Sequence, residues 1–395
     1  MFKFSEYTNK ISTDAISDIL KYMTAPGIIA FSGGSPAKET FPVDAIKVII
    51  DEALTKDAVS ILQYGSTGGR PELKKAYIEH IAKPKGIDVS EENLITLTGS
   101  NQGIGLIADV LLNPGDTVLV ESPTFLTTIM VLKKLSAKSI PVDVDKNGMK
   151  MDDLEEKIKK YSPKFIYTVP TFQNPTGLTL PTERREKIAA LAEKYGVIII
   201  EDDPYCELRY KGESLPPIKS FDKKGYVVLL SSFSKIIAPG LRVGVMAAHK
   251  DIIAKVTLAK QLDDTHSPNL NQIICAEFLN KGLLPGHIQK IIPIYAERLE
   301  AMLNAIKKYF PKEAVCTKPE GGLFVWGSLP GDVNMKDVLN RAATEEKVAF
   351  VPGAPFYLNE IDGKNSFRLN FSSNPPEIID EGIKKLGRIL TEYVD

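Results

Sequence analysis

The sequence predicts an α/β protein with a large domain, built on a mainly parallel sheet of seven strands, and a smaller α+β domain. Seven short apolar runs alternate with helical segments between residues 94 and 247, which is the pattern of a parallel sheet covered by helices. Residues 197–200 are Val-Ile-Ile-Ile, and four consecutive apolar residues suit a strand that is buried on both faces. The chain has 395 residues, which is enough for two domains.

The first 42 residues are expected to form an arm and part of the smaller domain. A helical pattern covers residues 12–23 and ends at Ala25-Pro26-Gly27. A short apolar strand follows over residues 28–31. The next residues, Ser-Gly-Gly-Ser-Pro from position 32, form a loop whose glycines allow the backbone to approach a ligand closely.

The large domain is expected over residues 43–285. It opens with a helix over residues 43–57, and Pro71 begins a second helix, because proline is tolerated in a first turn. The seven strands are expected at residues 94–98, 117–121, 137–142, 165–169, 197–202, 226–231 and 243–247.

The smaller domain is expected over residues 286–395. A long helix over residues 288–309 leads into it from the large domain. Its remaining elements are expected to be strands at 321–326, 348–351 and 367–371 and a final helix at 376–394.

Composition narrows the possible partners. The 49 basic and 50 acidic residues leave a net charge of -1, which argues against nucleic acid or an anionic membrane as an obligate partner. Three cysteines and four histidines are widely spaced, so neither a disulfide framework nor a metal site is predicted. No secretory signal or apolar stretch of membrane-spanning length is visible. A cytoplasmic enzyme acting on small molecules is therefore expected.

A lysine among hydroxyl residues follows the sixth predicted strand. The segment contains Ser232, Ser234 and Lys235, with Arg242 seven residues further on. Hydroxyls and a guanidinium suit a phosphate group, and a lysine amine whose cationic form is disfavoured can attack an aldehyde. Pyridoxal 5'-phosphate (PLP) carries both an aldehyde and a phosphate.

A second anion site is predicted where Thr98-Gly99-Ser100-Asn101-Gln102 leaves a strand and begins a helix. The same segment matches the TGxxxGxG pattern of short-chain dehydrogenases, with Glu121 in place to bind a ribose. The nucleotide interpretation is disfavoured because the motif lies almost 100 residues into the chain. The sequence also lacks the catalytic Tyr-x-x-x-Lys pair of those dehydrogenases.

Other polar or aromatic residues follow strands, where open α/β sheets bind ligands. Phe125 could stack on a planar ring, or pack in the core. Asn174, in the turn Asn-Pro-Thr-Gly, could aim its amide at a ligand oxygen. Asp202 could pair with a pyridinium nitrogen and Tyr205 with a ring hydroxyl, although a surface acidic loop is the alternative.

Arg368 stands in the apolar strand predicted near the C-terminus. A buried guanidinium requires an anionic partner, so Arg368 would either grip a substrate carboxylate or form a structural salt bridge.

Taken in order from the Gly33-Gly34 loop to Arg368, these motifs resemble the fold-type I PLP-dependent aminotransferases of class I and II. The segments Ser-Phe-Ser-Lys, ending at Lys235, and Glu-Asp-Asp-Pro-Tyr, ending at Tyr205, are similar to one branch of that family. The branch contains 2-aminoadipate, kynurenine, aromatic and multi-substrate aminotransferases.

The resemblance implies a role for each motif residue. Lys235 would bond to PLP and carry the substrate Cα proton, and Asp202 would pair with the ring nitrogen. Asn174 and Tyr205 would bind the ring oxygen, and Phe125 would stack on the ring. The phosphate would be held by Ser100, Asn101, Gln102, Ser232, Ser234 and Arg242.

The resemblance also implies a homodimer with a shared active site, because Tyr64 would reach the phosphate bound by the partner subunit. Arg368, Asn174 and Gly34 would contact the substrate. Two residues depart from close relatives: Asn101 stands where glutamine is common, and Ser17 stands where 2-aminoadipate enzymes often have arginine. The second departure weakens the case for acidic substrates.

The expected reaction moves an amino group from an aromatic, aliphatic or 2-aminoadipate-like L-amino acid to a 2-oxo acid, with 2-oxoglutarate as the expected acceptor. A PLP-dependent C–S β-lyase remains an alternative, because it would use the same cofactor site. A PLP-binding module of a transcription regulator is a further alternative. It is disfavoured because only about 30 residues precede the Gly33-Gly34 loop, where such regulators carry a winged-helix domain.

Overall fold

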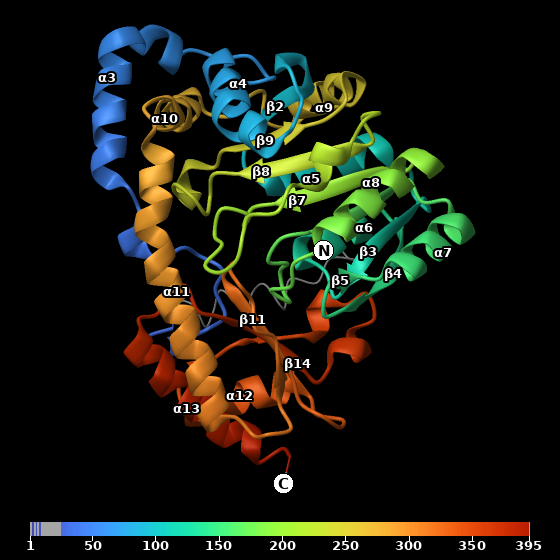
Figure 1. Ribbon diagram of the computed structural model, residues 1–395, viewed down its shortest axis with the longest axis vertical. Coiled ribbons are helices and arrows are strands. Elements are labelled where there is room, and N and C mark those ends of the chain that lie inside the picture. The colour runs from blue at the N-terminus through green and yellow to red at the C-terminus, as the bar shows by residue number, and fades with distance from the viewer. Residues whose placement is uncertain (1, 4, 6–7, 9–24, 395) are drawn as a thin grey trace.

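The computed structural model describes residues 2, 3, 5, 8 and 25–394, and the helix expected over residues 12–23 lies outside this part. A large helix-covered sheet and a smaller unit lie at opposite ends of the molecule (Figure 1). The long helix α11 (Leu283–Tyr309) runs from one to the other. None of the helices in the described residues is long and apolar enough to cross a membrane.

The large sheet contains all seven predicted strands and one short addition. Their order in space is β2-β9-β8-β7-β6-β3-β4-β5. The added strand β5 (Gly148–Met149) pairs antiparallel with β4 and is too short to show an alternating pattern. The seven others are β2 (Leu94–Leu97), β3 (Thr117–Ser122), β4 (Lys138–Asp145), β6 (Phe165–Thr168), β7 (Ile198–Asp203), β8 (Val227–Ser232) and β9 (Gly244–Ala247).

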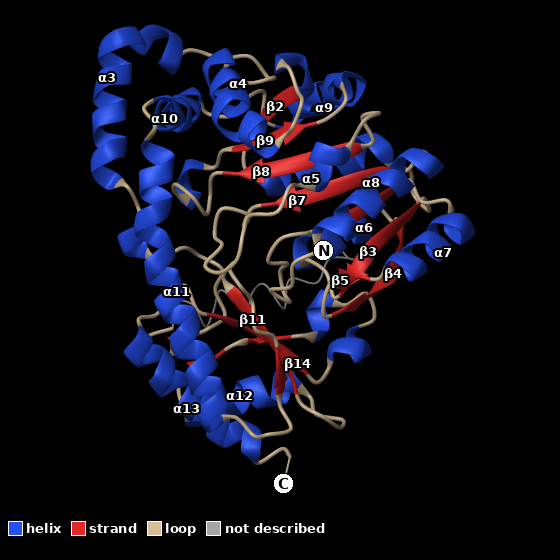
Figure 2. Cartoon of the chain, viewed as in Figure 1, coloured by secondary structure: helices blue, strands red, loops and turns tan. Residues whose placement is uncertain are grey.

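Helices cover both faces of this sheet (Figure 2). Side chains alternate along each strand, so Val118 and Val120 pack with α5, whereas Leu119 packs with α7 and α8 on the other face. Burial on both faces explains the apolar run at 197–200. The helices are α3 (Val43–Leu62), α4 (Pro71–Tyr77), α5 (Ser100–Leu111), α6 (Leu126–Lys134), α7 (Met151–Tyr161), α8 (Thr182–Tyr195), α9 (Lys250–Asp263) and α10 (Asn269–Asn280).

Strand direction brings the predicted site residues to one edge of the sheet. The adjacent strands β3, β6, β7 and β8 are parallel, so their carboxyl ends lie side by side. These ends are Ser122, Thr168, Asp203 and Ser232. The loops that follow β3, β6, β7 and β8 therefore share one rim of the sheet.

The smaller unit is built on an antiparallel sheet in the order β10-β11-β14-β13. Its strand β11 starts three residues later than predicted, because Gly322 has a φ of +71° and belongs to a turn. The elements are β10 (Val315–Cys316), β11 (Phe324–Ser328), β13 (Val351–Pro352), β14 (Ser366–Asn370), α12 (Met335–Glu345) and α13 (Pro376–Thr391). Near the start of the chain, β1 (Ile29–Ala30) pairs in parallel with β12 (Val348–Ala349) and so joins this unit.

Helix α11 contributes to both cores. Its 27 residues give a length of about 40 Å. Ile291 and Tyr295 pack in the core of the large sheet, whereas Leu299 and Met302 pack with β11, β14 and α13. One continuous helix therefore sets the distance between the rim of the large sheet and the smaller unit.

Candidate active site

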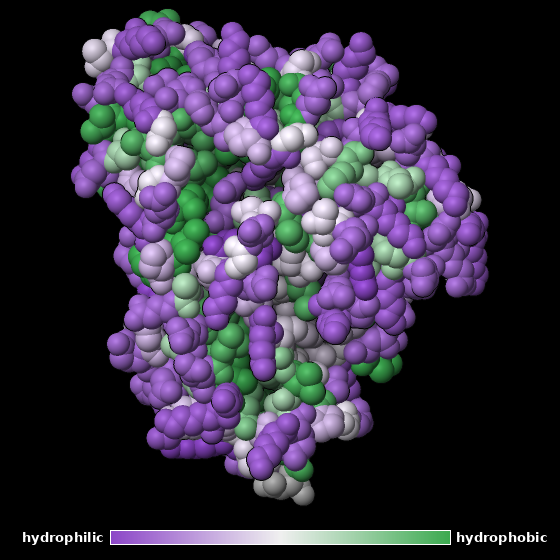
Figure 3. Space-filling model, in the orientation of Figure 1, coloured by the Kyte–Doolittle hydropathy of each residue, from purple (hydrophilic) through white to green (hydrophobic). Residues whose placement is uncertain are grey.

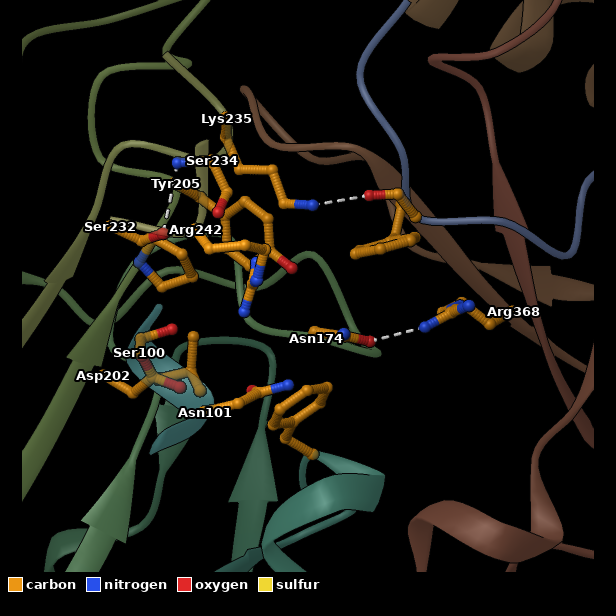
Figure 4. Close-up of a pocket in the computed structure, with 15 residues that line it drawn as sticks. Ser100, Asn101, Asn174, Asp202, Tyr205, Ser232, Ser234, Lys235, Arg242 and Arg368 are labelled. Carbon is orange, nitrogen blue, oxygen red and sulfur yellow. Dashed lines mark hydrogen bonds between the residues drawn. The ribbon is translucent and has the colours of Figure 1, made fainter. Parts of the chain in front are cut away.

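A cavity of about 250 Å³ lies at the rim of the large sheet and is closed on one side by the smaller unit (Figure 4). It gathers twelve of the fourteen predicted site residues, with Gln102 and Tyr64 outside it. The lining consists of Gly34, Ser100, Asn101, Phe125, Val169, Asn174, Asp202, Pro204, Tyr205, Ser232, Ser234, Lys235, Arg242, Phe324 and Arg368.

One end of the cavity is rich in groups that donate hydrogen bonds to an anion. Ser100 and Asn101 begin α5, where backbone N–H groups have no acceptor within the helix. Arg242 is held beside them by a bond from its Nη2 to the Thr98 carbonyl at 3.2 Å. The Ser232 hydroxyl accepts a bond from the Ser234 N–H at 3.2 Å, which fixes the loop on the opposite side (Figure 4).

Gly99 lets these groups come together. Its φ is +86°, a conformation that glycine adopts without strain. A Cβ at this position would lie 2.3 Å from the Arg242 Nη2 atom. The glycine therefore allows the arginine to pack directly on the loop that begins α5.

Asp202 lies at the floor of the cavity with one oxygen unpaired. Its Oδ2 accepts a bond from the Tyr167 hydroxyl at 2.8 Å, while Oδ1 is buried and has no partner in the described part of the chain. Burial raises the pKa of Asp202 to about 7, against the lowering effect of the Tyr167 bond. A bound group that presents a positively charged N–H to Oδ1 would satisfy it.

Lys235 projects into the middle of the cavity. Its Nζ donates to the Gly34 carbonyl at 2.7 Å, which brings the N-terminal loop to the site (Figure 4). Burial lowers the pKa of Lys235 to about 8, and the charges of Arg242 and Arg368 act in the same direction. A substantial fraction of this amine is therefore neutral near physiological pH and can act as a nucleophile or base.

Arg368 forms the far wall on β14. Its guanidinium lies 4.2 Å from the Phe324 ring and 5.2 Å from the Phe356 ring. Its Nη1 donates to Asn174 Oδ1 at 2.8 Å, and its Nε is buried without a partner in residues 25–394. Burial lowers the pKa of Arg368 to about 10, so the group stays cationic at neutral pH. No carboxylate pairs with it among the described residues, so its charge is available to a bound anion.

The loop that carries Asn174 is fixed from below by two buried charged residues. Arg185 on α8 donates to the Pro170 carbonyl at 2.8 Å and to Thr171 Oγ1 at 2.9 Å. Glu121, 2% exposed at the end of β3, accepts from Gln173 Nε2 at 3.2 Å. It also accepts bonds from two residues at the end of β6, Thr168 and Val169. Glu121 is thus fully engaged, which rules out the ribose-binding role.

The side chains of two predicted site residues, Gln102 and Tyr64, do not point into the cavity. The side chain of Gln102 turns away from the cavity and bonds the Thr98 N–H and Asp264, so its predicted contact with a phosphate does not fit this structure. The spacing in the motif places Gln102 in the first turn of α5, but contacts with α9 occupy its amide. Tyr64 is 82% exposed and stacks edge-on against His266.

The sequence did not predict the contributions of Phe324 and Tyr167 to the site. Phe324 lies between Arg368 and Tyr205, whose ring it meets edge-on at 6.0 Å. The paired glycines before it were the available signal, because a Cβ on Gly321 would lie 2.2 Å from the Leu208 carbonyl. Tyr167 supports Asp202, and its hydroxyl within an otherwise apolar strand required a buried partner.

Comparison with known proteins decides the family. The model for class I and II aminotransferases matches residues 27–386. The chain belongs to this family. It is 41% identical to aromatic-amino-acid aminotransferase 1 of Thermococcus litoralis over 98% of the chain and 94% of the relative.

Two solved structures extend the comparison. The kynurenine aminotransferase of Pyrococcus horikoshii, in complex with PMP, superposes with a TM-score of 0.95 at 39% identity, covering 99% of this chain and 98% of that one. The α-aminoadipate aminotransferase of Thermus thermophilus, complexed with N-(5'-phosphopyridoxyl)-L-leucine, gives 0.91 at 34% identity and the same coverage. This aminotransferase therefore has the fold-type I architecture and depends on PLP.

The cavity fits PLP at both ends. The unpaired Oδ1 of Asp202 suits the protonated ring nitrogen, and the hydroxyls, the start of α5 and Arg242 suit the phosphate. Three cations line the cavity, Lys235, Arg242 and Arg368, against the single carboxylate of Asp202. That excess of positive charge suits a phosphate and a substrate carboxylate bound together.

Gly99→Ala should weaken PLP binding by about 10- to 100-fold, because the new Cβ displaces the Arg242 guanidinium and removes a charge-assisted bond. Equilibrium titration of cofactor-free protein with PLP measures this change. Gly115→Ala is the matched control: its φ is +88° and its Cβ would meet nothing within 4 Å. Both substitutions should cost about 1–2 kcal/mol of stability through strain. Equal PLP affinity in the two variants would refute the role given to Gly99.

Proposed function

We propose that this aminotransferase prefers L-amino acids with aromatic or aliphatic side chains. Arg368 carries the proposal: a guanidinium stacked on Phe324, with a buried unpaired Nε, suits a substrate carboxylate beside an apolar side chain. The relatives named for aromatic amino acids and kynurenine support the same class. A 2-aminoadipate-like donor is disfavoured because Ser17, which lies outside the described residues, stands where 2-aminoadipate enzymes often have arginine.

The roles proposed for the cavity residues follow from their contacts. PLP, when bound, withdraws electrons from the substrate Cα and makes its proton removable. Lys235, with a pKa near 8, would take that proton from the substrate Cα and deliver it to the C4' atom of the cofactor. Arg368 would hold the substrate carboxylate and so orient the Cα–H bond toward Lys235, while the smaller unit excludes water.

Four further residues would hold the ring. Asp202 would keep the ring nitrogen protonated, and Phe125 would stack on the ring face. Asn174 and Tyr205 would bind the ring oxygen. Burial raises the pKa of Tyr205, which outweighs the effects of Arg368 and of its bond with Asn174, so Tyr205 stays a protonated donor.

We propose 2-oxoglutarate as the acceptor of the second half-reaction. It has a C1 carboxylate next to an oxo group, as does the 2-oxo acid released in the first half-reaction. Its carboxylate would bind Arg368, and its oxo group would lie near Lys235, in the same way. The residues 43–285 would form the cofactor-binding domain and 286–395 the smaller domain, with residues 1–42 as an N-terminal arm and part of the smaller domain. Helix α11 would be shared between the two domains.

Absorbance titration tests the reaction and the donor class. Phenylalanine, tyrosine and leucine should convert the bound PLP to its amine form at least about 10-fold more efficiently than 2-aminoadipate, and 2-oxoglutarate should reverse the change. Lys235→Ala should bind PLP at the phosphate end yet lose at least about 1,000-fold in the rate of conversion. Preference for 2-aminoadipate would contradict the donor proposal. Release of pyruvate from cystathionine without an added oxo acid would favour the β-lyase.

We also propose a cytoplasmic homodimer with shared active sites. Tyr64 is held outward by its neighbours: Asn269 Nδ2 bonds the Gln63 carbonyl at 2.8 Å, and His266 packs against the Tyr64 ring. Exposed apolar residues lie nearby on α3, among them Val59 and Leu62. Figure 3 shows apolar side chains gathered between α3 and the upper part of α11. An outward aromatic beside such a surface suits a second subunit.

Subunit mixing tests the shared site. Tyr64→Ala and Lys235→Ala dimers should each be weak at limiting PLP, whereas their randomised mixture should recover about one quarter of wild-type activity. Each mixed dimer would contain one site with both residues intact. A mixture of Tyr64→Ala with the double variant Tyr64→Ala/Lys235→Ala is the matched control and should recover none. Equal activity in the two mixtures would mean that Tyr64 does not serve the partner.

A further inference from the structure

A buried lysine lies behind the anion-binding end of the cavity without lining it. Lys260, on α9, is 0% exposed. A buried ammonium is unfavourable unless it is paired and hydrogen-bonded. Its Nζ meets Asp264 Oδ1 at 2.6 Å and Oδ2 at 2.7 Å, and it donates to Gln102 Oε1 at 3.0 Å. None of these contacts reaches a group that the reaction uses directly.

Gln102 connects Lys260 to the loop that begins α5 through hydrogen bonds. Its Oε1 accepts the Thr98 N–H at 2.8 Å as well as the bond from Lys260. Its Nε2 donates to Asp264 Oδ2 at 2.8 Å, and the Thr98 hydroxyl donates to the same oxygen at 2.7 Å. Thr98, Gln102, Lys260 and Asp264 thus form one connected group, here called the Lys260 cluster.

The Lys260 cluster contacts the loop that begins α5 at both of its ends. Thr98 precedes Gly99, and Gln102 is the third residue of α5, so Ser100 and Asn101 are held between two fixed points. The Thr98 carbonyl also receives the Arg242 Nη2 bond at 3.2 Å. The position of the guanidinium and of the first N–H groups of α5 therefore depends on where the cluster holds Thr98.

The charge of Asp264 strengthens the hydrogen bonds within the Lys260 cluster. Burial would raise the pKa of Asp264, but bonds from Lys260, Gln102 and Thr98 bring it below its ordinary value. Asp264 is therefore an ionised acceptor at neutral pH, and charge-assisted bonds of this kind are shorter and stronger than neutral ones.

We propose that Lys260 is a positioning residue for the cofactor phosphate: through Gln102 and Asp264 it sets the loop at Ser100 and Asn101 and the Arg242 side chain, and so makes the protein prefer PLP to pyridoxal. This inference rests on the phosphate site proposed above. Pyridoxal offers the same aldehyde and ring but no phosphate, so binding of pyridoxal does not depend on the loop.

Binding measurements on cofactor-free protein with PLP and with pyridoxal test the inference. Lys260→Met should weaken PLP binding by about 10-fold or more, as loss of a supporting contact does at other ligand sites, and change pyridoxal binding less than about 2-fold. Gln102→Met, which keeps the Lys260–Asp264 pair, should show the same selective loss and serves if Lys260→Met folds poorly.

Lys219→Met is the matched control. Lys219 is also a buried lysine paired with an aspartate, Asp222, at 2.8 Å, and it donates to the Val227 carbonyl at 2.7 Å. Val227 begins β8 whereas Ser232 ends it, so this pair lies about 16 Å along the strand from the phosphate end. Lys219→Met should lower stability and leave the preference for PLP unchanged.

Arg242→Met separates this inference from the proposed phosphate site. Arg242→Met could lose affinity for PLP but not for pyridoxal, while Lys260→Met and Gln102→Met both keep their affinity for PLP. That result overturns the inference and leaves the phosphate site in place. Equal losses of affinity for PLP and for pyridoxal in Lys260→Met and Gln102→Met would show a merely structural role and would also overturn the inference. If Arg242→Met also keeps the full preference for PLP, the phosphate site itself is misassigned and the inference falls with it.

Discussion

The active site depends on a single unbalanced carboxylate. Asp202 ends the most deeply buried part of the sheet, and only one of its two oxygens has a partner among the residues that the structure describes. A buried anion is unfavourable without a cation, so the fold leaves this position to be completed by a bound group. The Tyr167 hydroxyl fixes which oxygen remains bare, and Asp202 is buried on a strand that pairs with β6 on one side and β8 on the other. The protonated ring nitrogen of PLP would supply the missing charge.

The architecture supplies the other contacts from two directions. Four parallel strands end at one rim, and their loops bring together residues far apart in the chain, from Ser100 to Lys235. The opposite wall comes from the smaller unit through Arg368 and Phe324. Since α11 packs in both cores, it holds these walls at a fixed separation. On the proposed roles, the cofactor contacts would come mainly from the large sheet, and the contact with the substrate carboxylate would come from the smaller unit.

The sequence predicted those features that depend on local pattern. Strands buried on both faces give unbroken apolar runs, and polar residues directly after them identify the rim, so most of the cavity lining was predictable. Features that depend on contacts between distant segments were not. The family resemblance made Gln102 a predicted phosphate ligand, yet its amide bonds Lys260 on α9 and Asp264 just after it. Phe324 reaches the cavity only because Gly321 and Gly322 let β11 approach its neighbours closely, and no periodic signal marks that approach.

Nitrogen-15 NMR of protein loaded with PLP that is labelled at the ring nitrogen tests the central claim most directly. The account predicts a protonated ring nitrogen in the wild-type protein at pH 8, and loss of that proton in Asp202→Asn, where the carboxylate charge is gone. Lys219→Met, which alters a distant buried charge, should leave the nitrogen signal unchanged. An unprotonated nitrogen in the wild-type protein, or the same signal in Asp202→Asn, would contradict the claim that the bare oxygen of Asp202 organises this site.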